Sequence, residues 1–517
     1  MNISFAEDMR DIDLRVTRDY GLPEIVLMEN AGRRTAEEMA KLIDGVQDRV
    51  ICVFAGSGNN GGDALASARH LINMGARVKL FFTGDSNHLR KAARAMHDAL
   101  IAMGVEVCVF ESDRDWDRLR VALRFSDGVV DGILGTGMQE ELRQPTLRVI
   151  EEINAAAKPT LSIDLPSGVE SDTGRVRALA VRATCTLALG LPKVGHFLGQ
   201  GANFVGELLV DDIGIPQDLL EGNALHQSLI TKESAARLLP IRQRDVHKGI
   251  CGRILVLAGS LGMTGAAALS ASAALGIGAG VVTLAAPERL YDILAGKLTE
   301  VMTVPIQDGG DGHFGGVTAL QKALAIAEDF DAVLIGPGLG RAPETEEFVR
   351  CFAAAVKVPL VIDADAIYAF RDRLDALRDL PQVPVVTPHI GEFAGLLGIS
   401  VDEVRSDLLR HARDAAREYQ CIFVVKSECT IVVYPDGDAF FTTCGNPGMA
   451  TAGAGDVLAG AIVGLMRQMD SRMAPLVGVY LHGYAGDLAY ASMGNGLVAG
   501  DILAVLPAAL RDLGNGN

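Results

Sequence analysis

Short apolar runs alternate along this chain with segments in which apolar residues recur every three or four positions. Buried strands that alternate with helices are typical of a parallel α/β sheet. In the first half we predict strands at 50–55, 77–82, 106–110, 128–134, 159–165, 183–190 and 206–213. In the second half we predict strands at 253–260, 280–287, 332–338, 359–366, 384–389, 421–427 and 430–435. Two amphipathic helices are expected within residues 1–45, and a pair of small-residue helices near 476–510.

The alternation lapses between the two halves, around the segment DDIGIPQDLLEGNALHQ. A chain of 517 residues is too long for one ordinary hydrophobic core. We therefore predict an α/β protein with two domains, residues 1–217 and 228–517. The span 254–287 carries no charged residue and is long enough to cross a bilayer. Its glycine-rich breaks instead predict a strand, a loop, a helix and a second strand.

The net charge and the cysteines of the chain limit which binding partners and which cellular compartment we expect. A formal net charge of −18 repels the phosphate groups of nucleic acids and of anionic membranes, so we expect neither as a partner. The eight cysteines include no C-x-x-C pair, which favours reduced thiols in the cytoplasm. The N-terminal segment lacks the apolar core of a signal peptide. The small-residue apolar helices of the second half favour a homo-oligomer.

A glycine-rich loop follows the strand predicted at 50–55. Gly56, Gly58 and Gly61 have the G-x-G-x-x-G spacing of a dinucleotide site at the start of a helix. Two carboxamides and the carboxylate of Asp63 crowd the position that a pyrophosphate would need free of negative charge. The loop therefore favours a nucleotide bound in another way than as an ordinary hydride carrier.

Polar residues also follow two later strands of the first half. Asp131 lies near the end of one strand, and Asp164 and Ser167 follow another. Carboxyl ends of parallel strands line a common crevice, so these residues and Asn60 are expected to converge. Oxygen ligands of low total charge suit a monovalent cation at Asn60, Asp131 and Ser167. Asp164, against an apolar strand, is the candidate for proton transfer, although an Asx turn or a helix cap explains each residue alone.

The motifs LMENAG, GNNGGD, DGILGTG, SIDLPSG and LALGLPKVGH resemble those of NAD(P)H-hydrate epimerases over nearly all of residues 1–215. The resemblance implies a Rossmann-like α/β/α sandwich, a catalytic Asp164, and K⁺ held by Asn60, Asp131 and Ser167. It departs from many relatives at Ala64, where they continue the loop with glycine. The residues that it implies for the hydrated nucleotide are Asn59, Asn60, Gly61, Gly62, Asp63, Gly135, Thr136, Gly137, Met138, Gln139, Glu140, Glu141 and Asp164.

In the second half, Gly453, Gly455 and Asp456 precede an apolar helix. Backbone amides at a helix N-terminus stabilise an anion, and an adjacent carboxylate is then better interpreted as a base than as an anion ligand. A helix cap is the alternative. The segment KSECT, 426–430, could bring a cation and a hydroxyl to a phosphate, although an exposed hairpin lysine is the common explanation. His389 lies at the same end of the sheet, and a structural role is the more common explanation for a lone histidine.

The stretches HKGICGRILVLAGS, GPGLG, VIDADAI, TPHIGEF and GMATAGAGDVLAG resemble the ribokinase-like superfamily, and more narrowly ADP/ATP-dependent NAD(P)H-hydrate dehydratases, over about residues 235–510. The resemblance implies that Ala266, Gly338, His389 and Asp456 contact the hydrated dinucleotide, with Asp456 catalytic. ADP or ATP with Mg²⁺ is the implied cosubstrate. The residues implied for it are Lys426, Ser427, Glu428, Cys429, Thr430 and Gly455. Ser427 departs from the usual Lys-Gly pair.

Together the two resemblances imply a bifunctional repair of nicotinamide cofactor. The first domain would epimerise the R and S hydrates of NADH or NADPH, and the second would dehydrate the S hydrate at the expense of ADP or ATP. Two alternatives stay open from the residues. In the first alternative, the second half is a ribokinase-like small-alcohol kinase fused to a nucleotide-binding module. In the other, the first half senses nucleotides without catalysis.

Overall fold

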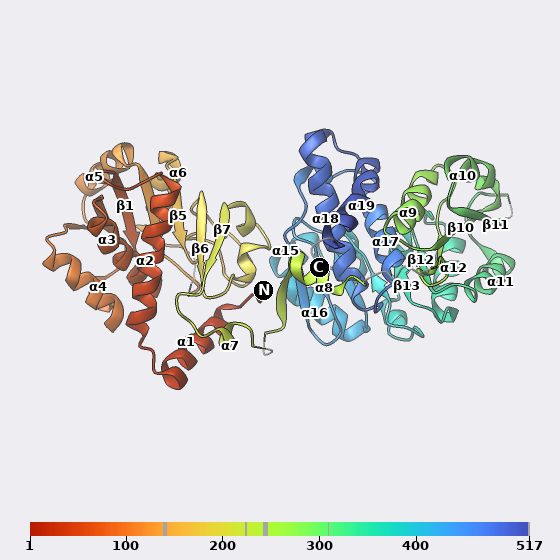
Figure 1. The fold of residues 1–517 in the computed structure, drawn as a ribbon, viewed down its shortest axis with the longest axis horizontal. Coiled ribbons are helices and arrows are strands. Elements are labelled where there is room, and N and C mark those ends of the chain that lie inside the picture. The colour runs from red at the N-terminus through yellow and green to blue at the C-terminus, as the bar shows by residue number, and fades with distance from the viewer. Residues whose placement is uncertain (138–141, 223–224, 241–246, 309, 515–517) are drawn as a thin grey trace. The chain divides into compact units, whose positions relative to one another are not determined.

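The computed structural model describes residues 1–137, 142–222, 225–240, 247–308 and 310–514. The chain divides into two compact units, 2–225 and 226–517, and Met1 groups with the second (Figure 1). The helices of the first unit are α1 (Ala6–Tyr20), α2 (Glu24–Leu42), α3 (Asn59–Asn73), α4 (Lys91–Ala102), α5 (Asp113–Phe125), α6 (Thr146–Ala156) and α7 (Gln217–Leu220). None of the described helices combines the length and apolarity needed to cross a membrane.

The described strands of the first unit form one parallel sheet in the order β3-β2-β1-β4-β5-β6-β7. They are β1 (Val50–Ala55), β2 (Arg77–Phe82), β3 (Val107–Cys108), β4 (Gly128–Gly132), β5 (Thr160–Ile163), β6 (Cys185–Leu189) and β7 (Glu207–Asp211). The chain leaves β1 toward one edge and later returns to its other side at β4. Ligand crevices of doubly wound sheets lie at such a reversal, beyond the carboxyl ends of the strands.

Side chains alternate across this sheet with the period of two that a strand imposes. In β1, Ile51 and Val53 join a core with α1 to α4, whereas Cys52 and Phe54 join a core with α5 and α6. Both faces are therefore covered by helices, which explains why the strands read as continuous apolar runs. The expected α/β/α sandwich is confirmed.

The second unit has a longer sheet, in the order β11-β10-β9-β12-β13-β14-β15-β16-β17-β8. Its parallel direction is interrupted only at β16, which runs antiparallel to both neighbours. The strands are β8 (Gln227–Ile230), β9 (Arg253–Leu257), β10 (Val281–Pro287), β11 (Met302–Ile306), β12 (Ala332–Ile335), β13 (Leu360–Ile362), β14 (Val385–Val386), β15 (Ile422–Val425), β16 (Ile431–Val433) and β17 (Ala439–Thr442). Here the reversal lies between β9 and β12.

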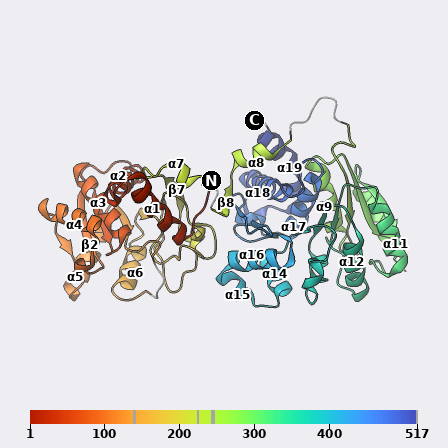
Figure 2. The same ribbon diagram turned by 90° about the horizontal axis from the view of Figure 1, so that it is seen from below.

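Helices again cover both faces of this sheet, as Figure 2 shows for α17 on one side and α14 on the other. In β15, Val424 joins the core with α17, whereas the Phe423 ring packs edge-on against Phe393 of α14 at 5.4 Å. The helices are α8 (Lys232–Leu238), α9 (Thr264–Gly276), α10 (Tyr291–Lys297), α11 (Gly316–Ala327), α12 (Pro343–Ala355), α13 (Asp365–Tyr368), α14 (Ile390–Leu397), α15 (Val401–Ser406), α16 (Leu408–Tyr419), α17 (Ala454–Leu465), α18 (Ala474–Met493) and α19 (Ala499–Gly514).

Every strand predicted from the sequence is present, although most are shorter, and the uncharged span 254–287 forms β9, α9 and β10 as expected. Three strands were not predicted: β8, β11 and β17. Two of them, β8 and β11, are the edges of the sheet, and β11 contains Pro305, which lacks the amide that a central strand needs. Edge strands carry a weaker apolar signal because they are less buried.

Candidate active sites

The glycine-rich loop of the first unit lies at the reversal between β1 and β4. A Cβ added to Gly56 would stand 2.0 Å from the carbonyl oxygen of Ile133, and one on Gly61 would stand 1.9 Å from the carbonyl oxygen of Gly56. Only glycine permits these backbone contacts. The loop after β1, the start of α3 and the segment after β4 are therefore pressed together, and Asn60 is held between them.

Asp131 is the centre of a buried hydrogen-bond network at the end of β4. Its carboxylate is fully buried and accepts bonds from Ser162 Oγ at 2.8 Å, Ser167 N at 2.9 Å and Ser167 Oγ at 2.6 Å. Burial raises the pKa of Asp131, and the bonds from Ser167 oppose that rise. Leu134 links the network to the glycine-rich loop, because its amide donates to Ser167 Oγ at 2.9 Å and its carbonyl accepts from Asn60 Nδ2 at 2.6 Å.

The three residues expected to hold a cation are thus brought together. The Asn60 Oδ1 atom is buried and has no hydrogen-bond partner among the described residues. An unpaired buried oxygen is costly and rare, so it calls for a ligand. A neutral amide oxygen, a hydroxyl and one carboxylate suit a monovalent cation such as K⁺, and the residues present fit that ion.

Asp164 follows β5 in a strained backbone conformation, with φ of 63°, in the left-handed region that non-glycine residues seldom adopt. Its carbonyl oxygen is 2.7 Å from His196 Nε2. The other ring nitrogen, Nδ1, accepts from the Lys193 amide at 2.9 Å, so Nε2 carries the proton and donates to Asp164. Burial lowers the pKa of His196 to about 4, which keeps this tautomer neutral.

The Asp164 carboxylate forms an ion pair with Lys193, a side chain that is only 2% exposed. Lys193 Nζ also donates to the Leu189 carbonyl at 2.8 Å, and the Leu189 amide donates to Asp164 Oδ1 at 3.2 Å. We expected this carboxyl group to lie against an apolar strand, and the structure shows that the Lys193 ammonium and the Leu189 amide also contact it. Lys193 was missed as a functional residue, although it lies in the quoted motif LALGLPKVGH.

Three further residues predicted to contact the nucleotide, Asn59, Asp63 and Gly135, lie in or against the glycine-rich loop. Asp63 is buried, and burial together with the nearby Asp164 charge raises its pKa well above the ordinary value. Gly135 packs against Asn60, since a Cβ there would stand 3.1 Å from the Asn60 Cβ. Asn59 Oδ1 is 3.4 Å from Arg90. Met138, Gln139, Glu140 and Glu141 lie outside the described residues.

The second candidate site lies at the reversal between β9 and β12. Gly338 follows β12 with φ of 62°, and a Cβ there would stand 3.1 Å from the Ala266 Cβ on α9. Ser260, after β9, donates to the Gly338 carbonyl at 2.8 Å. Ala266 and Gly338, two of the residues expected to contact the dinucleotide, are therefore neighbours in space, although 72 positions separate them in the sequence.

Lys426 directly follows β15 and points to the first turn of α17. A Cβ added to Gly455 would stand 3.1 Å from Lys426 Nζ, and the ammonium is 3.0 Å from Asp363 Oδ1. Burial disfavours the charge on Lys426, but the carboxylates of Asp363 and Glu392 raise its pKa. Lys426 is 20% exposed, so it is no exposed hairpin lysine. This arrangement places one cation beside the amides that begin α17.

Asp456 lies inside the first turn of α17, which begins at Ala454, whereas we expected Asp456 to precede the helix. Burial and the Asp363 charge raise the pKa of Asp456 to about 7, while Lys426 opposes that rise. A carboxyl group with such a pKa is suited to take up and release a proton near neutral pH. Asp363 is a further residue of this site, and the sequence signal was its place at a strand end in VIDADAI.

The remaining predicted residues of this site have mixed surroundings. Ser427 donates to the Cys429 carbonyl at 2.5 Å, Cys429 is buried, and Glu428 is exposed. The His389 backbone pairs with Lys426, which brings it to the site. Its side chain also caps α14, because Nδ1 accepts from the Glu392 amide at 3.1 Å. His389 therefore has a structural role as the cap of α14, and its contact with the hydrated dinucleotide stays a prediction.

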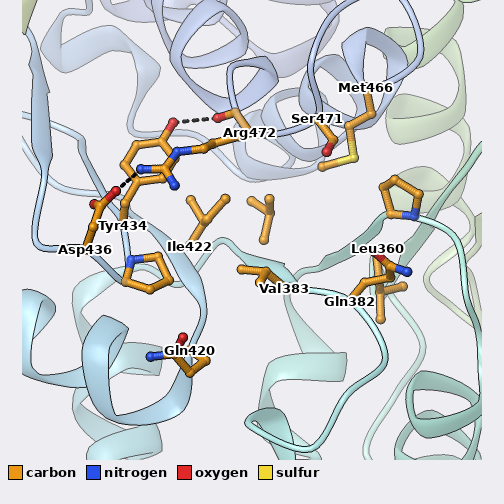
Figure 3. A pocket seen from close by; sticks show the side chains of 13 residues that line it. Leu360, Gln382, Val383, Gln420, Ile422, Tyr434, Asp436, Met466, Ser471 and Arg472 are labelled. Atoms are coloured by element: carbon orange, nitrogen blue, oxygen red, sulfur yellow. Dashed lines mark hydrogen bonds and ion pairs between the residues drawn. The ribbon is translucent and has the colours of Figure 1, made fainter.

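A cavity of about 580 Å³ lies where β13, β14 and β15 begin, at the amino ends of these strands (Figure 3). Leu360, Val383 and Ile422 line it together with Tyr434. The Tyr434 hydroxyl donates to the Arg472 carbonyl at 2.6 Å, and Arg472 is paired with Asp436. Since the predicted site residues follow the carboxyl ends of the strands, the cavity is separate from them.

Comparisons with known proteins bear on both units. A family model described as YjeF-related protein N-terminus matches residues 24–195, and one described as NAD(P)H-hydrate dehydratase matches residues 254–508. A protein of Moorella thermoacetica named bifunctional NAD(P)H-hydrate repair enzyme Nnr is 41% identical over 99% of this chain and 97% of its own. A protein of Thermofilum pendens with the same name is 36% identical over the same shares.

Among solved structures, an ADP/ATP-dependent NAD(P)H-hydrate dehydratase from Bacillus subtilis, co-crystallized with ATP/Mg2+, is 29% identical with a TM-score of 0.47. The match covers 55% of this chain and 98% of that chain.

Proposed function

Because the chain belongs to the family of bifunctional NAD(P)H-hydrate repair enzymes, we propose that its two candidate sites divide the repair between them. The enzyme epimerises the hydrates of NADH and NADPH and dehydrates them to the reduced cofactors. We assign the epimerase to residues 1–217 and the dehydratase to residues 228–517. The family match of the second half disfavours the small-alcohol kinase.

The epimerase assignment rests on the environment of Asp164. Inverting the carbon that carries the hydroxyl group requires a bond at that carbon to break and to form again on the other face. One group must deliver a proton and another must accept it. Asp164 is ion-paired with Lys193, whereas burial and the nearby Asp164 charge raise the pKa of Asp63. Two carboxyl groups in such different surroundings are suited to these two roles.

Asn60, Asp131 and Ser167 would hold K⁺ in this site. The unpaired Asn60 Oδ1 atom is the observation that supports it. The ion would supply positive charge next to a loop that carries carboxylates. The chain's own residues then need only to fix the substrate: the amides of the glycine-rich loop bind it, and the contact between Gly56 and Ile133 keeps that loop rigid.

In the dehydratase, Asp456 would remove the proton from the hydroxyl group of the S hydrate. The oxygen then attacks the terminal phosphorus of ADP or ATP, and the shortened nucleotide leaves. Lys426 and the Gly455 amide lie where they can bind the phosphate groups. Phosphate next leaves the ring with the electrons of the carbon–oxygen bond, and the ring loses a proton. Phosphate is a better leaving group than hydroxide, which is why a nucleotide is consumed.

Mg²⁺ would accompany the nucleotide. The described residues contain no group of three His, Cys, Asp or Glu side chains that could hold a metal ion by themselves. Such a site fits Mg²⁺ that arrives on substrate phosphates and touches one or two carboxylates. Either reduced cofactor, and either ADP or ATP, is compatible with the residues of this site.

The cellular setting is also proposed. All eight cysteines are free, which supports a reducing compartment such as the cytoplasm. Self-association and the lack of nucleic-acid and membrane binding stay predictions.

The function is tested by incubating the full chain with a mixture of NADH hydrates and ADP or ATP. We expect recovery of the absorbance of reduced nicotinamide. D164N should abolish exchange between R and S hydrates and leave dehydration of the S hydrate intact, and D456N should do the reverse. If D164N exchanged the epimers at the wild-type rate, the first unit would be a nucleotide sensor instead.

A further inference from the structure

Asp363 is buried next to the proposed dehydratase site and is ion-paired with Lys426. It follows β13 and is 1% exposed. Its Oδ1 atom accepts from Thr387 Oγ1 at 2.6 Å and from Lys426 Nζ at 3.0 Å. Its Oδ2 atom is buried and has no hydrogen-bond partner among the described residues. The carboxylate is thus oriented by one hydroxyl group and directed at one ammonium.

Stability alone is a poor explanation for this ion pair. Burying two charges costs about as much as their attraction returns, so a buried ion pair is weak evidence for stabilisation. The unpaired, buried Oδ2 atom adds a further desolvation cost. A group retained at such a cost next to a reactive centre is more readily explained by function.

The geometry shows what the carboxylate does for Lys426. The ammonium stands beside Gly455, one residue before Asp456. Without a competing partner, a lysine in that place would pair with Asp456 and hold the base as an inert carboxylate. Asp363 takes up the ammonium from the β13 side, so Lys426 faces the phosphate-binding amides of α17 and Asp456 keeps its affinity for a proton.

We propose that Asp363 is a positioning residue of the dehydratase, which fixes Lys426 beside Gly455 through Oδ1 and so leaves Asp456 free to act as the base. The inference rests on the proposed roles of Asp456 and of Lys426. Thr387 belongs to the same device, because its hydroxyl group orients the carboxylate that Lys426 contacts.

The test is D363N in the full chain. Asparagine keeps the shape and an oxygen that accepts from Thr387 and Lys426, and removes only the charge. We expect kcat for dehydration of the S hydrate to fall at least tenfold, with the epimerase rate of the same chain unchanged. The acid limb of the dehydratase pH profile should move to lower pH, because a like charge beside Asp456 is lost and the positive charge of Lys426 is no longer balanced by Asp363.

The matched control is D436N, which removes a carboxylate paired with Arg472 at the cavity where β13, β14 and β15 begin. We expect D436N to leave both rates and the pH profile unchanged. T387V keeps the Asp363 charge and removes its orienting donor; we expect a smaller fall in kcat. Urea unfolding separates loss of fold from loss of function.

The proposal is overturned if D363N and D436N give the same kcat and the same pH profile. That outcome is distinct from failure of the proposed function, in which D456N itself would retain dehydration.

Discussion

At the scale of single residues, the two proposed catalytic carboxyl groups differ in what surrounds them. Asp164 is paired with a buried lysine and accepts a hydrogen bond from a backbone amide. Asp456 shares its surroundings with a second carboxylate, Asp363, and its pKa is raised to about 7. Residue type alone does not distinguish these roles. The neighbours that distinguish them come from other strands and loops.

The pKa of Asp456 predicts the pH dependence of dehydration. A base is active as the carboxylate, so kcat/KM should rise with pH through about 7 and fall about tenfold for each unit below it. The measurement is the dehydration rate between pH 5.5 and 8.5, with the epimerase rate of the same chain as the control. A dehydratase profile that stays flat down to pH 5.5 would contradict the assignment of Asp456 as the base.

Asn60 predicts a dependence on K⁺ in the epimerase alone. N60A removes the unpaired Oδ1 atom, and we expect the K⁺ concentration for half-maximal epimerase rate to rise at least tenfold, about 1.4 kcal/mol for one lost ligand. The titration replaces KCl with choline chloride at constant ionic strength. N73A, on the exposed end of the same helix, is the matched control. If the epimerase rate of the wild-type chain did not depend on the K⁺ concentration, the assignment of a K⁺ site to Asn60 would be wrong.

At the scale of elements, small residues let helices of the second unit approach closely. A Cβ added to Gly460 of α17 would stand 2.2 Å from the Ser270 carbonyl of α9, and one on Gly464 would stand 2.6 Å from the Ala274 carbonyl. The small-residue composition that we associated with self-association therefore serves, at these positions, to pack α17 on α9. That contact fixes the first turn of α17, which carries Gly455 and Asp456.

G460A is accordingly expected to lower the free energy of unfolding by about 1 to 3 kcal/mol, because an extra methyl group in a close-packed interior forces backbone to move. It should also lower the dehydratase rate while sparing the epimerase. The measurement is urea unfolding. G395A is the matched control: a Cβ there meets nothing within 4 Å, so we expect a gain of about 0.5 to 1 kcal/mol from helix propensity. If G460A and G395A had the same free energy of unfolding, α9 and α17 would be able to move apart enough to admit the extra methyl group.

At the scale of the whole molecule, the chain joins two units that each have their own sheet and core. A dehydratase that accepts only one epimer leaves the other unrepaired. An epimerase in the same chain converts that other epimer into the one that the dehydratase accepts. Each site is built at the strand-order reversal of its own sheet, from residues of its own unit. The two activities are therefore expected to be separable by single substitutions.

Mixing variants tests this separation. With both hydrates and ADP present, D164N alone should stop once the initial S hydrate is consumed, whereas the wild-type chain should convert both epimers. Adding D456N to D164N should restore full conversion, because the epimers diffuse between chains. The measurement is the final absorbance of reduced nicotinamide, read before uncatalysed exchange of the epimers contributes. A mixture that stops where D164N stops would show that the two sites of one chain must act together.

The sequence by itself determined the alternating strands and helices, the uncharged span that is no membrane helix, and the motifs of both sites. These features are local: apolar periodicity and glycine spacing act within a few residues of each other. It did not reveal the edge strands β8 and β11, whose weaker burial leaves a weaker pattern.

Only the tertiary structure decided which polar groups meet. The pairing of Asp164 with Lys193 and of Asp363 with Lys426, and the unpaired oxygen of Asn60, join residues from separate loops. The reason is physical: charge and protonation depend on burial and on neighbours a few ångströms away, and those neighbours are brought by the fold and not by the order of the chain.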